Sequence, residues 1–111
     1  MATTTALLVT IIVEDEDHAI RMAETLVLER LAATANVQGS HLAYRLQDGE
    51  LSQYGEFAIR ATTSAKRFDA LCERVSTMPG IVVPGVTASA LTAAHPRFEP
   101  WLRSVLEICG G

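Results

Sequence analysis

The chain has 111 residues, of which 49% are apolar and 20% are charged, and its formal net charge is −4. This length suits one domain over residues 1–111 that buries its own core. Lys and Arg do not cluster, so neither nucleic acid nor an anionic membrane is expected as the main partner.

The N-terminal stretch MATTTALLVTIIVEDED joins a long apolar run directly to four acids. It lacks the positive segment that opens a signal peptide, so a first strand over Ala6–Val13 is the better interpretation. We therefore expect a cytoplasmic protein.

A helix is predicted from Asp15 to Leu31, because apolar residues recur there at helical spacing: Ala19, Ile20, Ala23, Leu26, Val27 and Leu31. The acids at residues 14–17 precede it, where carboxylates favour the positive end of the helix dipole. Successive side chains point apart and no glycine-turned loop follows, so helix capping explains these acids better than Ca²⁺ or Mg²⁺ binding.

A long hairpin is predicted next. The stretch AATANVQGSHLAYRLQ indicates a second strand that is broken near Gly39, and Asp48-Gly49 is a hairpin turn signal. The return strand is expected from about Glu50 to Thr62.

The second half repeats the strand and helix pattern. Thr63 or Ser64 is expected to cap a helix that ends at Met78-Pro79-Gly80 and carries an apolar stripe of Phe68, Leu71, Cys72 and Val75. The stretch IVVPGVTASA predicts a fourth strand, and Pro84 favours an edge position or a bulge for it. A last helix is expected from Pro96 to Ile108, with one face formed by Phe98, Trp101, Leu102, Val105 and Leu106.

These elements predict an α+β protein: a ferredoxin-like βαββαβ sandwich with a C-terminal helix. Cys72 and Cys109 are too far apart for a disulfide framework or a zinc knuckle, so both are interpreted as inert thiols.

Several segments give the chain a resemblance to a known family. They are LVLERLAATANVQG, the Tyr-Arg before the hairpin turn, RATTSAKRFDALCERV, the Val-Pro at residues 83–84 and the PWL near the end. In order and spacing they resemble the CutA family of divalent-cation tolerance proteins over about Leu8 to Val105. The resemblance implies a ferredoxin-like fold related to PII signalling proteins, a homotrimer held by strand pairing through the hairpin from Leu42 to Ile59, and a role in the response to metal ions.

The chain departs from the family pattern at polar positions. Thr34 stands where the family has a cysteine, Pro79 where it has a histidine and Gly85 where it has a glutamate. Copper and zinc need several converging thiolate or imidazole donors. His18, His41 and His95 show no ligand spacing, so no metal site and no cofactor are predicted.

No catalytic motif is present, so the sequence leaves open whether the chain is an enzyme. Two alternatives to metal tolerance stand: a PII-like scaffold that binds a metabolite or protein partner, and an enzyme that reuses the cleft between subunits for a small anionic substrate. The predicted ligand-binding residues are His41, Tyr44, Arg45, Tyr54, Glu56, Arg60, Arg97 and Trp101. Cross-strand pairing is the simpler explanation for Arg45, Glu56 and Arg60, with Arg45 and Glu56 able to pair with each other.

Overall fold

The computed structural model describes residues 5–78 and 85–107, and the order of its elements is the predicted one. The elements are β1 (Ala6–Val13), α1 (Glu16–Leu28), β2 (Thr34–Gln47), β3 (Glu50–Ser64), the short 3₁₀ helix η1 (Ala65–Arg67), α2 (Phe68–Ser76), β4 (Val86–Ala90) and α3 (Phe98–Leu106). Within these residues the chain forms an α+β fold with a four-stranded sheet and three α-helices.

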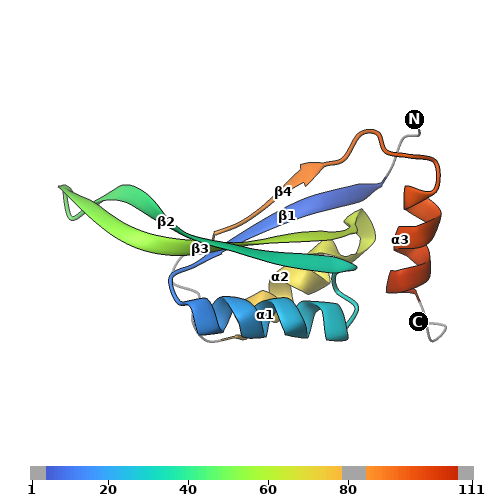
Figure 1. Cartoon of the computed structure of the whole chain (residues 1–111), viewed down its shortest axis with the longest axis horizontal. Coiled ribbons are helices and arrows are strands. Elements are labelled where there is room, and N and C mark those ends of the chain that lie inside the picture. Colours follow the sequence, from blue (N-terminus) through green and yellow to red (C-terminus); the bar gives the residue numbers. More distant parts are fainter. Residues whose placement is uncertain (1–4, 79–84, 108–111) are drawn as a thin grey trace.

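The strands lie in the order β2-β3-β1-β4, and every neighbouring pair is antiparallel. The fourth strand thus occupies an edge, as predicted, although Pro84 and the first residues of the predicted strand lie outside the described residues. Helices α1 and α2 cover one side of the sheet, and α3 stands at the end of the sheet where β1 begins (Figure 1).

The core lies between the sheet and helices α1 and α2. Alternate residues of a strand point to opposite faces, so Val9 and Ile11 of β1 and Ile59 of β3 all point toward the helices. They are fully buried against Met22, Leu26, Leu71 and Val75.

Helix α1 begins as predicted and ends earlier. The Asp15 carboxylate accepts a hydrogen bond from the backbone N–H of His18 at 3.0 Å, which confirms the capping role of the acidic stretch. The helix ends at Leu28, three residues before the predicted end. Arg30 adopts a left-handed φ of 58°, and the N–H groups of Leu31 and Ala32 turn back to donate to the Leu26 carbonyl.

The predicted cap of the second helix is right in position only: Ser64 is the N-cap residue of the 3₁₀ helix that leads into α2, but its side chain makes no capping hydrogen bond. Strand β3 continues to Ser64, because Thr63 and Ser64 still pair with Leu7 and Ala6 of β1. The chain then enters the 3₁₀ helix without a side-chain cap. Thr63 is buried instead, and its hydroxyl donates to the Leu31 carbonyl at 2.6 Å.

Helix α3 packs through Leu102 and Leu106 against Ala6 and Ala33. Trp101, which the sequence places on the same helix face, is not among the buried residues of this cluster. Its side chain is at the margin of the apolar face, 43% exposed, where its ring centroid is 6.0 Å from that of Phe98.

Candidate functional site

A two-stranded ribbon projects from the sheet and carries most of the predicted site residues (Figure 1). Strand β1 pairs with β3 only over residues 57–64, so residues 41–56 of β2 and β3 pair only with each other in the described part of the protomer. The register shifts between Gln38 and His41, which confirms the predicted break near Gly39. Gly39 has a φ of 138°, a conformation that side-chain-bearing residues rarely adopt.

One side of the ribbon is polar. His41 lies opposite Glu56, and its Nε2 is 3.3 Å from a Glu56 carboxylate oxygen. Arg45 contacts Tyr54, donating to its hydroxyl at 3.3 Å and lying over its ring at 4.2 Å from the centroid. A second guanidinium nitrogen of Arg45 forms an ion pair with Glu14 at 3.3 Å.

The expected pairing of Arg45 with Glu56 is therefore wrong. Ser52 lies opposite Arg45 in the register, whereas His41 lies opposite Glu56. Sequence reasoning missed Glu14 as a site residue because it assigned the whole acidic stretch to the helix start. Arg45 instead connects the ribbon to the segment that follows β1.

The opposite side of the ribbon is apolar, and Tyr44 belongs to it. Side chains on this side are between 59 and 73% exposed although they are large. We call them the apolar ribbon face: Leu42, Tyr44, Leu46 and Leu51. They cover no other described part of the protomer.

The remaining predicted residues lie elsewhere. Arg60 lies on the sheet itself, in β3. Arg97 precedes α3 and is exposed, and its backbone N–H donates to Nδ1 of His95 at 3.0 Å. Since Arg97 and Trp101 are at the opposite end of the molecule from the ribbon (Figure 1), one protomer does not bring the eight predicted residues together.

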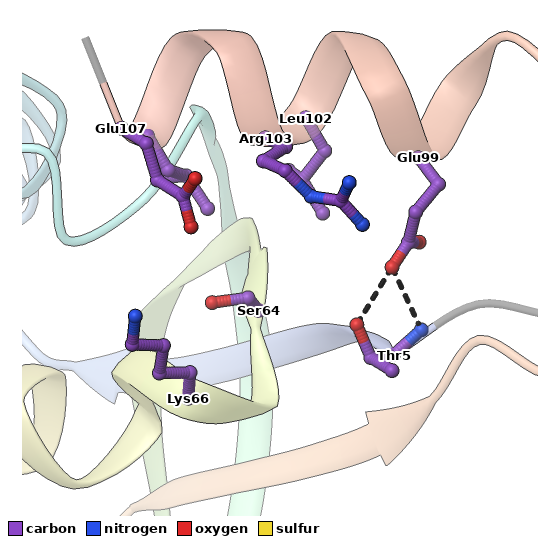
Figure 2. Close-up of a pocket in the computed structure, with 8 residues that line it drawn as sticks. Thr5, Ser64, Lys66, Glu99, Leu102, Arg103 and Glu107 are labelled. Carbon is purple, nitrogen blue, oxygen red and sulfur yellow. Dashed lines mark hydrogen bonds between the residues drawn. The ribbon is translucent and has the colours of Figure 1, made fainter. Parts of the chain in front are cut away.

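A small cavity of about 100 Å³ lies between α3, the start of β1 and the end of β3 (Figure 2). Glu99 closes one end of it: one carboxylate oxygen accepts from the Thr5 hydroxyl at 2.6 Å and from the Thr5 N–H at 3.1 Å. These hydrogen bonds from Thr5, with a smaller contribution from the charge of Arg103, hold the pKa of the Glu99 carboxyl below its usual value. The other carboxylate oxygen is buried without a hydrogen bond to any described residue.

The charges around this cavity are mixed. Its lining includes two cationic side chains, Lys66 and Arg103, and two acidic ones, Glu99 and Glu107. Leu102 and Leu106 are the apolar residues that line it. Sequence reasoning missed this cavity, since Thr5 and Glu99 are 94 residues apart and belong to no motif. The nearest signal is the spacing of Glu99 and Arg103, which places both on one side of a helix.

The residues that the structure describes do not bring metal-ligating side chains together in one protomer. Residues 5–78 and 85–107 contain no group of three His, Cys, Asp or Glu side chains that could hold a metal ion. The three histidines lie on separate segments, and burial together with the charge of Asp69 raises the pKa of the Cys72 thiol. Pro79, one of the three positions compared with the family donors, lies outside the described residues.

The helices of the described residues are all too short or too polar to span a membrane.

Comparison with known proteins identifies the family. Residues 7–105 match the family model of the CutA1 divalent ion tolerance protein. The divalent-cation tolerance protein CutA of Thermus thermophilus is 35% identical over 96 residues, which are 86% of this chain and 92% of that protein.

Solved structures agree with this match. The Thermus thermophilus protein Cut A1 superposes with a TM-score of 0.81 at 30% identity and covers 89% of this chain and 96% of its own. CutA1 of Ehrlichia chaffeensis shares the fold with a TM-score of 0.85 at 18% identity, over 95% of this chain and 98% of its own. The chain therefore belongs to the CutA1 divalent ion tolerance family.

Proposed function

We propose that this chain acts in tolerance of divalent cations, as a cytoplasmic homotrimer of ferredoxin-like protomers. The observation that carries the proposal is the family match over residues 7–105, together with the Thermus thermophilus relative that is named a divalent-cation tolerance protein. The strand order β2-β3-β1-β4 and the two helices on one side of the sheet support the ferredoxin-like classification.

The apolar ribbon face supports the trimer. A leucine side chain contributes about 1.5–3 kcal/mol when it is fully buried, so a second copy that covers this face gains several such contributions. The edge strands β2 and β4 also leave backbone groups available for pairing. If each ribbon contacts a different surface of the next copy, three copies form a closed ring when successive copies are related by a rotation of one third of a turn.

The side chains at the positions of the family's metal donors support a tolerance role in which the protein does not bind copper or zinc tightly. Thr34 is a half-buried hydroxyl in β2, a much weaker ligand for these ions than a thiolate. At Gly85, an added Cβ would lie 3.1 Å from the Ile12 Cβ, so the close approach of the two backbones leaves little room for a longer side chain.

A growth experiment tests the proposed function. The chain is expressed in a bacterial strain that lacks its own CutA, and growth is followed over a series of Cu²⁺, Zn²⁺ and Co²⁺ concentrations. We expect the chain to restore growth at cation concentrations that inhibit the strain carrying an empty vector. Equal inhibition of both strains at confirmed expression would contradict the proposal.

Matched variants test whether tolerance depends on the trimer. Leu46→Glu places a charge on the apolar ribbon face, while Leu28→Glu places the same charge on α1, where the leucine is slightly more exposed, at 80% against 73%. We expect the first variant to lose both the trimer and tolerance, and the second to keep both. If tolerance survives in a monomeric Leu46→Glu protein, the trimer is not needed for it.

A further inference from the structure

The cavity beside α3 has room for a small ligand. It measures about 100 Å³ and lies inside one protomer, between α3, the start of β1 and the end of β3 (Figure 2). One water molecule accounts for about 30 Å³ in the liquid, so the cavity holds about three waters or one molecule of similar size. All the residues that line it belong to one chain, so the site does not depend on what covers the sheet in an assembly.

Glu99 contributes a carboxylate oxygen that lacks a donor. Thr5 holds one oxygen of this carboxylate through its hydroxyl and its backbone N–H, at 2.6 and 3.1 Å. The other oxygen, Oε2, is buried and accepts no hydrogen bond from residues 5–78 and 85–107. The hydrogen bonds from Thr5 lower the pKa of Glu99, so the carboxyl is ionised at neutral pH. A buried, charged oxygen without a donor is costly, so a donor group inside the cavity would stabilise it.

Two cations line the same cavity and have donors to spare. Arg103 is one turn after Glu99 on α3, and Lys66 lies across the cavity in η1 (Figure 2). Both are exposed, and neither side chain forms an ion pair or a hydrogen bond with a residue that the structure describes. The Arg103 guanidinium lies between the carboxylates of Glu99 and Glu107 in Figure 2 without closing on either. The two cations can therefore donate to an acceptor that enters the cavity.

The charges that line the cavity cancel. Lys66 and Arg103 balance Glu99 and Glu107. A simple anion would meet two carboxylates there, and a simple cation would meet two cations. A molecule with one charge of each sign finds a partner for both. Residues four apart on a helix have Cβ atoms about 5–6 Å apart, so Glu99 and Arg103 can contact neighbouring charged groups of one small molecule.

We propose that this cavity binds a small zwitterion, an α-amino acid of the size of glycine or alanine. The ammonium group of the ligand donates to the free oxygen of Glu99, and its carboxylate accepts from Arg103 and Lys66. The apolar part of the ligand lies against Leu102 and Leu106, which line the same space. Amino acid binding at this site is an activity beyond cation tolerance.

Calorimetric titration of the full chain with glycine and with alanine tests the proposal. Acetate and methylammonium are the matched ligands, because each carries only one of the two charges; ionic strength is held constant with sodium chloride. We expect at least one of the amino acids to bind about tenfold or more tightly than either single-charge ligand, which lacks one hydrogen-bonded charge. The melting temperature should rise with the concentration of that amino acid, because the ligand binds only the folded state, in which α3 meets the sheet.

Two variants each remove one partner of the ligand. Arg103→Gln removes the donor for the ligand carboxylate, and since Arg103 is exposed the variant should fold as the wild type does. Glu99→Gln removes the charge that attracts the ammonium group but keeps an oxygen that can accept from Thr5. Each should weaken amino acid binding by about tenfold. Arg21→Gln is the matched control, because Arg21 is exposed on α1 and does not line the cavity.

Any of four results would overturn the proposal. Neither amino acid binds the wild type at millimolar concentration, which would mean that water alone fills the cavity. An amino acid binds no more tightly than acetate or methylammonium. Arg103→Gln binds the amino acid as tightly as the wild type. Arg21→Gln loses as much affinity as Arg103→Gln, which would mean that net charge governs binding. None of these results bears on cation tolerance, which the growth experiment measures separately.

Discussion

Replacing Thr63 by valine should destabilise the protein although the two side chains have nearly the same shape. Thr63 is fully buried, and its hydroxyl donates to the Leu31 carbonyl at 2.6 Å. That contact fixes the turn between α1 and β2, where Arg30 adopts its left-handed φ. Valine leaves the carbonyl without this donor.

The expected loss follows from the cost of an unsatisfied buried acceptor, about 1–3 kcal/mol. Because the hydrogen bond is partly buried rather than fully buried, the lower half of that range applies, about 1–2 kcal/mol. A loss of this size lowers the melting temperature by roughly 4 °C per kcal/mol in a protein of this length.

Urea unfolding followed by circular dichroism measures this loss. Both proteins are compared at one concentration, since oligomer stability depends on concentration. The matched control is Thr62→Val, because the side chain of Thr62 lies on the other side of β3 and is half-exposed. The reasoning is refuted if Thr63→Val unfolds at the wild-type urea concentration, or if Thr62→Val costs as much.

Four further outcomes are expected. Gly39→Ala should destabilise the bulge, because the new Cβ would lie 2.8 Å from a ring carbon and the φ of 138° does not suit alanine; thermal unfolding checks this. Hydrogen bonds from Thr5 lower the folded-state pKa of Glu99, so their stabilising contribution is present above the usual carboxyl pKa of 4.5 and is lost as the pH falls through the lowered pKa. The free energy of unfolding, measured by denaturation at a series of acid pH values, should therefore fall less with decreasing pH in Glu99→Gln than in the wild type. Leu46→Glu should shift the protein from trimer to monomer in gel filtration. Titration with Cu²⁺ or Zn²⁺ should show only weak binding. A tight stoichiometric site that persists in Cys109→Ser would contradict the expectation that the chain lacks converging thiolate and imidazole donors.

The sequence predicted the element order because the spacing of apolar residues changes clearly along the chain, from continuous or alternating in the strands to helical spacing in the helices. The strand Ala6–Val13 has the predicted bounds, and the break near Gly39 is present in the register. The ends of elements were less predictable, because they depend on contacts between distant segments. Strand β3 continues to Ser64 because β1 offers it pairing partners, which local propensity does not reveal.

The candidate site was only partly predictable for a similar reason. Alternation along a strand indicates which residues share a side, but the bulge at Gly39 sets which residues of β2 and β3 are opposite. That register pairs Glu56 with His41 and leaves Arg45 free to reach Glu14. Glu99 was missed because its partner, Thr5, is at the other end of the chain.

The solution mass of the purified chain tests the proposed assembly most directly. Multi-angle light scattering at micromolar concentration should give three times the 12.0 kDa mass of one chain. The same measurement on Leu46→Glu should give the mass of one chain. A wild-type protein that scatters as a monomer would contradict the account of the apolar ribbon face as a contact between copies.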